Sequence, residues 1–429
     1  MPLSVAIIGA GPAGLYCADR LLRDAPGAEI DIIEKLPTPF GLVRAGVAPD
    51  HQGTKGVTRV FERLFQRPEL AFWGNIEIGR DLSLEEIRAT YDAVVIATGA
   101  LSDRRLGIPG EDLPGVYGSA AFVGWYNGIP AHCGLAPKLD HVRSVVIIGN
   151  GNVAIDVARV LAKTPDEMAR SDLDPVVEAT IASAPLDTIW IVGRRGAADA
   201  RFSPAELAEL GTLARAAPLV DADELPGDVS SPTLDVLRKF SAGTADRPVR
   251  IRFRFGLRPE RIVGDDRATG VAFRRTVPAQ GTSPDECEFV TLPADLVVSC
   301  IGYGALACGS CVAENGVIPN VDGRIAEGLY VVGWAKRGPS GTIPTNRTES
   351  HAVAQRLVHE VEPAGRPGRQ GLAALIRRRG LSPVNWAGWQ AIDAQEIARA
   401  KQGRVRRKFR DIAEMLRHAG AADRETLTP

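Results

Sequence analysis

A strand, a glycine-rich turn and a helix follow one another at the start of the chain, and this unit constrains the fold more than any other stretch. Residues 5–8 (VAII) form a short apolar run that is typical of a buried strand. The turn 9–14 (GAGPAG) follows directly and leads into a helical pattern. Gly9 permits the tight turn, Gly11 lets the backbone approach a pyrophosphate, and Gly14 lets the helix pack on the strand. The pattern predicts a Rossmann-type unit that binds a dinucleotide.

Two further strands are expected in this unit. Residues 30–33 (IDII) end in Glu34, which follows the last glycine of the turn by about 20 residues, the spacing of a carboxylate that accepts hydrogen bonds from ribose hydroxyls. Residues 91–100 (YDAVVIATGA) are typical of a buried strand beside the first, and their small final residues let the chain pass close to a cofactor. An ordinary parallel strand is the alternative.

The same unit returns in the middle of the chain. Residues 145–148 (VVII) predict a strand, and residues 149–154 (GNGNVA) match the G-x-G-x-x-A form of the glycine turn. The next strand ends in Arg194 and Arg195, where the first unit has an acid. Paired guanidinium groups bind a 2′-phosphate that a carboxylate would repel. We therefore expect FAD in the first unit and NADPH, in preference to NADH, in the second; a solvated arginine pair is the alternative.

These two units predict an α/β chain with two Rossmann-like dinucleotide-binding domains, of the two-domain flavoprotein (glutathione reductase-like) type. The length of 429 residues suffices for two or three domains. Residues 101–118, rich in Gly and Pro, are the expected crossing, and a strand at 295–303 is expected to return to the first domain. We predict an FAD-binding domain at 1–103 that resumes at 297–429 with a basic tail, and an NADP-binding domain at 104–296.

Composition excludes several classes of partner. The net charge of −1 gives no whole-protein field that would attract nucleic acid or a membrane surface. An apolar run of about 18 residues, which a membrane-spanning helix needs, does not occur. The six Cys are too few for a disulfide scaffold and favour a reducing, cytoplasmic setting. An acidic partner would therefore have to meet a local basic patch.

Two stretches could supply such a patch, although each could equally be a solvated surface. Residues 249–255 alternate apolar side chains with three arginines, which predicts a strand with one basic face, and residues 271–275 are its expected hairpin partner. Residues 366–417 form a basic tail. The candidate docking residues are Arg250, Arg252, Arg254, Arg274, Arg275, Arg404, Arg406, Arg407 and Lys408.

Weaker patterns predict further elements. Apolar spacing favours a helix at 54–65 and a strand near 76–79. Residues 164–186, with several Asp and Pro, suggest an inserted surface excursion. A final strand at 328–334 is followed by a helix near 345–360, whose N-terminus could stabilise negative charge on a reduced flavin.

Several stretches together resemble one family. They are GAGPAGLY, FGLVRAGVAPDH, ATGA, IPGEDLPG, GNGNVAIDVAR, VGRRG and GWAKRGPSGTI, in this order along the chain. On these motifs the chain resembles the adrenodoxin reductase type of ferredoxin–NADP⁺ reductase. The resemblance implies a monomeric FAD enzyme that takes hydride from NADPH and passes single electrons to a ferredoxin-type iron–sulfur protein. The chain departs from the family pattern at Ala45 and at Gln52 and Gly53.

The resemblance also implies site residues. The implied FAD contacts are Gly9, Gly11, Ala13, Gly14, Glu34, Leu42, Ile78 and Trp334, with Gly341, Thr342 and Ile343 near the isoalloxazine ring. The implied NADPH contacts are Asn150, Gly151, Asn152, Val153, Arg194, Arg195 and Glu206. His51 and Asp156 match a polar pair near the flavin that the family links to proton handling and redox tuning.

Other functions are weighed against this one. A pyridine nucleotide–disulfide reductase needs a C-x-x-C pair near the flavin, and residues 30–60 contain no Cys. An electron-entry subunit similar to the small subunit of glutamate synthase and a non-enzymatic NADPH redox sensor are the remaining alternatives. Cys308 and Cys311 have the spacing of a dithiol or of half a metal site, but no second pair accompanies them, so we expect them to be structural or incidental.

Overall fold

The computed structural model describes residues 1–244, 246–276, 288–401 and 403–420, and the chain forms two compact units. The first unit contains Met1–Ser102, Gly128–Pro130 and the chain from Tyr303 onward; the second contains Asp103–Asn127 and Ala131–Gly302. The chain thus returns to the first unit at Tyr303, later than the predicted position 297.

A six-stranded sheet forms the centre of the first unit, in the order β16-β17-β4-β1-β2-β3. Its strands are β1 (Ser4–Ile8), β2 (Glu29–Ile33), β3 (Leu70–Trp73), β4 (Ala93–Ile96), β16 (Arg324–Ala326) and β17 (Leu329–Val331). Neighbouring strands run parallel except β16 and β17, which are antiparallel. The pairing of β1 with both β2 and β4 confirms the predicted strand arrangement of the first unit.

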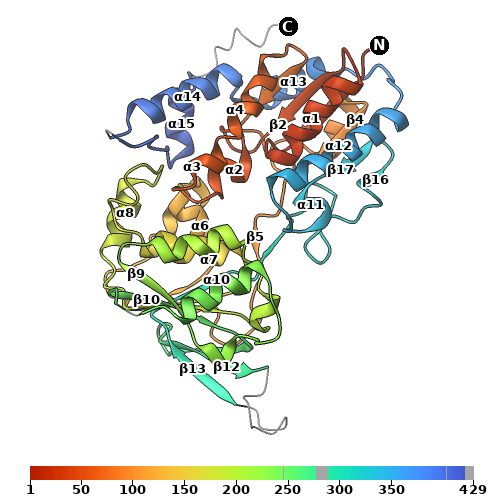
Figure 1. Ribbon diagram of the computed structural model, residues 1–429. Coiled ribbons are helices and arrows are strands. Elements are labelled where there is room, and N and C mark those ends of the chain that lie inside the picture. Colours follow the sequence, from red (N-terminus) through yellow and green to blue (C-terminus); the bar gives the residue numbers. More distant parts are fainter. Residues whose placement is uncertain (245, 277–287, 402, 421–429) are drawn as a thin grey trace. The chain divides into compact units, whose positions relative to one another are not determined.

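Helices cover both faces of this sheet, as Figure 1 shows. Helices α1 (Pro12–Asp24) and α12 (Ile343–Glu360) pack side by side on one face, and α5 (Leu84–Thr90) and α13 (Gly368–Arg379) cover the other. Alternate residues of β1 belong to the two hydrophobic clusters, because side chains alternate across a strand. The remaining helices of this unit are α2 (Gly41–Ala45), α3 (Gln52–Lys55), α4 (Thr58–Glu62), η1 (Arg63–Gln66), α11 (Trp334–Arg337), α14 (Trp386–Ala398) and α15 (Ile412–His418).

A buried carboxylate ties helix α13 to the sheet. Asp31 on β2 is 0% exposed and accepts hydrogen bonds from the Trp73 indole at 2.8 Å and from the Tyr91 hydroxyl at 2.9 Å. The Arg369 guanidinium of α13 donates to the same carboxylate at 2.9 Å. Burial raises the pKa of Asp31, and the positive charge of Arg369 opposes that shift.

A second six-stranded sheet, β6-β14-β7-β8-β10-β9, forms the centre of the second unit, and all its neighbouring strands run parallel. Its strands are β6 (Val116–Gly118), β7 (Ser144–Ile148), β8 (Thr188–Val192), β9 (Ala216–Val220), β10 (Val249–Arg254) and β14 (Leu296–Ser299). A three-stranded antiparallel sheet packs on it, and the shared hydrophobic cluster contains Val146, Leu257 and Phe273. The three strands are β11 (Leu257–Val263), β12 (Gly270–Arg275) and β13 (Phe289–Pro293).

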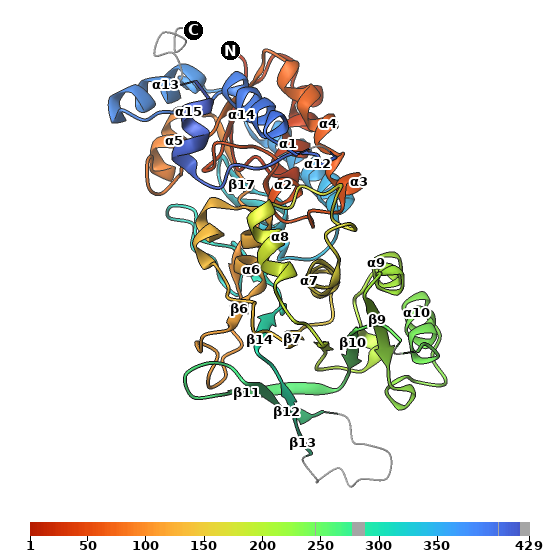
Figure 2. The same cartoon turned by 90° about the vertical axis from the view of Figure 1, so that its left-hand side faces the viewer.

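The helices of the second unit complete its layers, and α9 and α10 lie together, with α10 packed on the edge strand β9 (Figure 2). They are α6 (Ser119–Asn127), α7 (Asn152–Ala162), α8 (Pro175–Ala182), η3 (Ala197–Asp199), α9 (Pro204–Glu209), η4 (Leu210–Thr212), η5 (Ala222–Glu224) and α10 (Pro232–Ser241). The short elements β5 (Ser102–Asp103), η2 (Pro130–Leu135) and β15 (Tyr303–Gly304) lie where the chain crosses between units. No described helix is long and apolar enough to cross a membrane.

Two strand predictions are wrong. The alternating stretch does form β10, but β10 is an internal parallel strand between β8 and β9, and β12 pairs with β11 and β13 instead. The strand expected to return to the first domain is β14, which pairs with β6 and β7 in the second sheet. Alternation reveals which side chains share a face, but it does not identify the neighbouring strand.

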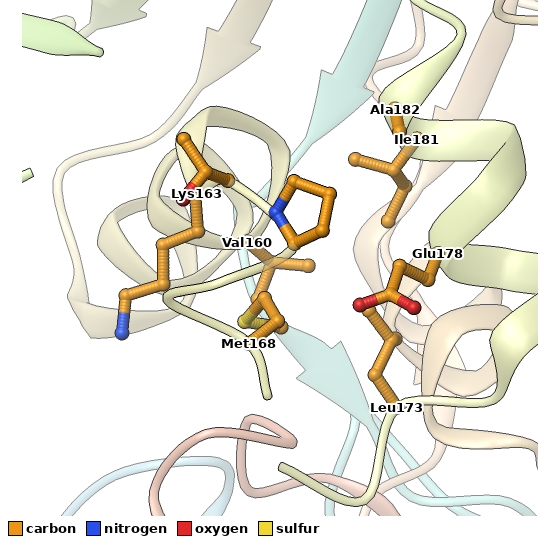
Figure 3. Close-up of a pocket in the computed structure, with 9 residues that line it drawn as sticks. Val160, Lys163, Met168, Leu173, Glu178, Ile181 and Ala182 are labelled. Atoms are coloured by element: carbon orange, nitrogen blue, oxygen red, sulfur yellow. The ribbon is translucent and has the colours of Figure 1, made fainter. Parts of the chain in front are cut away.

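Three local predictions are also wrong. The helix expected at 54–65 is broken into α3, α4 and η1, and Val60 is exposed. The strand expected near 76–79 lies earlier, at β3. The stretch 164–186 is no surface excursion, because Met168 and Leu173 are buried. Together with Ile181 of α8 they line a cavity (Figure 3). Its volume of about 10 Å³ is no larger than a single water molecule needs.

Removing the guanidinium that faces Asp31 should destabilise the first unit strongly. Arg369→Ala leaves a buried carboxylate without its ion-pair partner, and such changes cost about 3–5 kcal/mol of unfolding free energy. Arg378→Ala on the same helix is the control, because its exposed side chain makes only a 3.5 Å surface ion pair, worth about 0–1 kcal/mol. Chemical denaturation measures both variants.

The same variant has a pH signature. Without Arg369 the folded-state pKa of Asp31 should rise further above its unfolded value, so the deficit is full at neutral pH and shrinks as pH falls through that raised pKa. Equal losses in the two variants, or a deficit that grows on acidification, would contradict the role given to this ion pair.

Candidate functional site

The first glycine turn is shaped by backbone contacts and leaves one position open. Gly9 has φ +114°, and a Cβ there would lie 2.5 Å from the Ala97 carbonyl oxygen at the end of β4. A Cβ at Gly14 would lie 2.3 Å from the Gly9 oxygen, so helix and strand pack without room for a side chain. At Gly11, by contrast, a Cβ would meet no heavy atom within 4 Å. Because α1 begins at Pro12, its free N–H groups face this open surface.

Polar groups from two neighbouring strands join the turn. Glu34 follows β2 and is 8% exposed; its Oε2 accepts from the Ala10 N–H at 2.9 Å and its Oε1 from the Leu36 N–H at 3.1 Å. Burial raises the pKa of Glu34, and both backbone donors oppose that shift. Thr98 follows β4, and its buried hydroxyl has no hydrogen-bond partner among the described residues. The Ala-Thr-Gly stretch predicts a close passage of the backbone, but nothing in the sequence marks the Thr98 hydroxyl as part of the site.

Two other chain segments reach this turn, and a third is connected to one of them. A Cβ at Gly41 would lie 2.9 Å from the Gly11 Cα, which places α2 and its Leu42 beside the open position. A Cβ at Gly333 would lie 2.6 Å from the Ala13 side chain, and Trp334 follows directly as the first residue of α11. The Trp334 indole donates to the Ser340 carbonyl at 3.1 Å, which connects α11 to the segment that holds Gly341, Thr342 and Ile343 at the start of α12.

For two other residues predicted for this unit, the structure gives the place in the chain and the burial. Ile78 is 9% exposed and belongs to the hydrophobic cluster on the α5 and α13 face of the sheet. His51 is half-buried and precedes α3. Their roles as a cofactor contact and as a proton-handling residue stay predictions.

The second glycine turn repeats the geometry of the first. Gly149 has φ +143°, and a Cβ there would lie 2.3 Å from the Cys300 carbonyl oxygen at the end of β14. Gly151 is again open, with no heavy atom within 4 Å of its Cβ position, and α7 begins directly after it. The Asn150 side chain lies on Gly193, whose Cβ would overlap the amide, and its buried Oδ1 has no partner in the described part of the chain.

The segment that leads into α9 lies along this turn. The Arg201 N–H donates to the Asn150 carbonyl at 2.8 Å, and the Ser203 N–H donates to the Asn152 side chain at 2.7 Å. Ser203 also caps α9 by accepting from the Glu206 N–H at 3.3 Å. The structure therefore brings Glu206 into the same group as the turn residues. Val153 belongs to the first turn of α7.

Three arginines near this turn have free side chains. Arg194 and Arg195 follow β8, Arg201 precedes α9, and all three are exposed. In the described part of the chain, no carboxylate or other side chain pairs with them. Arg201 escaped sequence reasoning because it lies outside any regular spacing from the glycine turn. Free guanidinium groups of this kind can bind a phosphate in bidentate fashion.

Asp156 lies one turn along α7, beside a buried cation. The Arg159 guanidinium, which is 0% exposed, donates to the Asp156 carboxylate at 2.8 Å. The Cys300 thiol lies close to the same group: burial raises its pKa most, and the charges of Asp103 and Asp156 raise it further. The Asp156 carboxylate is therefore held in place by an ion pair with buried Arg159 within this unit.

The predicted basic face of β10 is present, since its arginines alternate with buried apolar residues and Arg250 is exposed, but carboxylates from other segments pair with part of it. Arg254 pairs with Glu224 at 2.5 Å, and Arg252 lies 4.0 Å from Asp221. The two arginines on the expected hairpin partner are also paired. They are Arg274, 3.1 Å from Glu260, and Arg275, 2.7 Å from Glu288.

Paired strand–turn–helix units of this kind define a class of oxidoreductases that bind two dinucleotides. The family model described as pyridine nucleotide-disulphide oxidoreductase matches residues 3–183. Human mitochondrial NADPH:adrenodoxin oxidoreductase is 39% identical, over 97% of this chain and 92% of that protein. A probable ferredoxin/ferredoxin–NADP reductase of Mycobacterium leprae is 40% identical, over 98% of this chain and 78% of that protein.

Solved structures agree with these relatives. FprA of Mycobacterium tuberculosis in complex with NADPH has a TM-score of 0.91 and 35% identity, over 98% of this chain and 100% of that one. The chain belongs to the adrenodoxin reductase family of ferredoxin–NADP⁺ reductases. The fold expected from the two glycine turns is thereby confirmed.

A substitution at Gly151, the open glycine of the second turn, can impair nucleotide binding without impairing folding. Gly151 has φ −125°, which any residue adopts, so Gly151→Ala should fold normally while its methyl group blocks the approach of a pyrophosphate. We expect its affinity for NADP⁺ to fall at least about tenfold, or 1.4 kcal/mol, by titration calorimetry. Gly149→Ala is the counterpart: its Cβ would collide with the Cys300 carbonyl, so it should lose stability first. Unchanged affinity in Gly151→Ala would contradict this geometry.

Proposed function

We propose that this protein is an FAD-dependent ferredoxin–NADP⁺ reductase, which takes hydride from NADPH and delivers single electrons to a ferredoxin-type iron–sulfur protein. The observation that carries the proposal is the contrast between its two open turns. One is joined by a buried carboxylate, Glu34, and the other by free guanidinium groups, Arg194 and Arg195. When bound, FAD supplies the chemistry that divides a two-electron hydride into one-electron transfers.

The residues of the first unit fit FAD. Each oxygen of Glu34 already accepts one backbone N–H and keeps a lone pair for a ribose hydroxyl. Gly11 and the start of α1 would hold the pyrophosphate, and the unpartnered Thr98 hydroxyl offers a further hydrogen bond. Trp334 and the start of α12 would lie along the isoalloxazine end. We therefore propose this unit as the FAD-binding domain.

The residues of the second unit fit NADPH. Gly151 would accommodate the pyrophosphate, and Asn150 has a free Oδ1 at the same turn. Arg194 and Arg195 would bind the 2′-phosphate that distinguishes NADPH from NADH. The remaining proposed contacts are Asn152, Val153 and Glu206. We propose this unit as the NADP-binding domain.

His51 and Asp156 are proposed as the residues that handle protons and tune the flavin. The ion pair with buried Arg159 supports this role for Asp156, since it fixes the orientation of the carboxylate. We further propose a monomer located in the cytoplasm. Both basic surfaces stay candidates for docking the iron–sulfur protein, since ion pairs engage only part of each: Arg254 pairs with Glu224 on the strand, and Arg406 pairs with Asp393 in the tail.

The function is tested by electron transfer to an acceptor protein. NADPH should bleach the flavin absorbance of the purified protein, and added ferredoxin should then support reduction of cytochrome c. A redox sensor would show the bleaching without ferredoxin-dependent turnover. Absence of bound flavin would refute the proposal as a whole.

Cofactor choice is tested at the arginine pair. Arg194→Ala/Arg195→Ala should raise KM for NADPH by about a hundredfold or more, because two charged hydrogen bonds are lost and each contributes roughly 1.5–3 kcal/mol, and leave KM for NADH nearly unchanged. Arg258→Ala is the matched control, an exposed arginine on β11 of the same unit. Equal losses with both nucleotides would contradict recognition of the 2′-phosphate.

A further inference from the structure

A tight hairpin at residues 308–311 (CGSC) places two cysteines of the first unit opposite each other. The Cys308 N–H donates to the Cys311 carbonyl at 3.0 Å, and the Cys311 N–H donates back at 3.1 Å. Residues paired in this way hold their Cα atoms about 5.5 Å apart with both side chains on one side of the hairpin. That separation lies inside the range of about 4.4–6.8 Å that a disulfide requires.

Contacts at its tip hold the hairpin in this conformation. Gly309 has φ +56°, and a Cβ there would lie 2.7 Å from the Leu84 side chain at the start of α5. The Ser310 hydroxyl bonds to the Glu85 carboxylate and lowers its pKa. The two cysteines are therefore held opposite each other at a Cα separation that a disulfide can span.

The two thiols differ in access. Cys308 is 3% exposed within the hydrophobic cluster under α5, and burial raises its pKa to about 12. Cys311 is half-buried; burial raises its pKa, and the nearby Arg88 guanidinium opposes that shift. An external disulfide can therefore reach Cys311 first.

We propose that Cys308 and Cys311 form a reversible dithiol–disulfide site that exchanges with a low-molecular-weight disulfide of the glutathione type. The Cys311 thiolate attacks one sulfur of oxidised glutathione, which breaks the S–S bond and releases one reduced glutathione. The Cys308 thiolate then attacks the Cys311 sulfur of the mixed disulfide and releases the second. Two thiols of the protein are oxidised, and two molecules of reduced glutathione carry away the two electrons and two protons.

A disulfide at this hairpin would serve redox exchange more than it would stabilise the fold. A disulfide stabilises a fold by constraining the unfolded chain, and this effect grows with the length of the closed loop. The loop here spans only residues 308–311, and the hairpin already forms with free thiols. The inference does not depend on the proposed electron-transfer function, because neither cysteine belongs to the nucleotide turns.

The test uses the holoprotein, treated with excess oxidised glutathione and analysed by intact-mass spectrometry after thiol alkylation. The wild-type chain should lose two hydrogen atoms and two alkylation sites, with no retained glutathione, and dithiothreitol should restore both. Peptide mapping should find Cys308 joined to Cys311. Flavin content should not change.

Single variants separate the two thiols. Cys308→Ala removes the resolving thiol and should accumulate one glutathione on Cys311, whereas Cys311→Ser leaves only the buried thiol at this hairpin and should not react there. Cys133→Ser, at a half-buried cysteine of the second unit, should behave as wild type. An adduct that persists in the wild-type chain, a disulfide between other cysteines, or no loss of hydrogen would each overturn the proposal.

Discussion

Both nucleotide turns depend on one steric constraint: the backbone after the first strand passes against the end of a neighbouring strand with no room for a side chain. The obstacle is the Ala97 carbonyl at Gly9 and the Cys300 carbonyl at Gly149. This close passage draws the ends of β4 and β14 up to the turns. It also turns the chain sharply. The glycine two residues later, Gly11 or Gly151, therefore lies directly before a helix with no heavy atom near its Cβ position.

The two sites differ in how their charged groups are held, and this difference suits two kinds of ligand. Glu34 is buried and fixed by two backbone donors, so its remaining lone pairs are preorganised before any ligand arrives. Arg194 and Arg195 are exposed and unpaired among the described residues, so they can close on a phosphate and release it. The first arrangement favours a resident cofactor, and the second favours a nucleotide that exchanges in every turnover.

Sequence reasoning located both glycine turns because each depends on residues that adjoin in the chain. It failed where partners come from elsewhere. The alternating sequence of β10 predicts a strand, but it does not show that β8 and β9 are its parallel neighbours. The sequence likewise does not show that β14 pairs with β7 in the second sheet and not with a strand of the first. Arg201 reaches the second turn through a backbone hydrogen bond to Asn150, across a loop without periodicity. The hairpin at 308–311 likewise could not be predicted from the sequence, since C-x-x-C spacing alone fits a helix, a loop or a strand pair.

Charge counts along the sequence overstate the basic surface that is left for a partner, because they do not show which charges pair within the fold. In a chain with a net charge of −1, a basic segment implies an acidic excess elsewhere, and folding can bring the two together. The tail shows this directly: Arg369 reaches the buried Asp31, and Arg379 reaches Glu86 at the start of α5. Burial makes the first of these pairs far more consequential than the second. Part of what resembles a docking tail is therefore an internal clamp that fastens α13 to the sheet and leaves fewer of its charges for a partner.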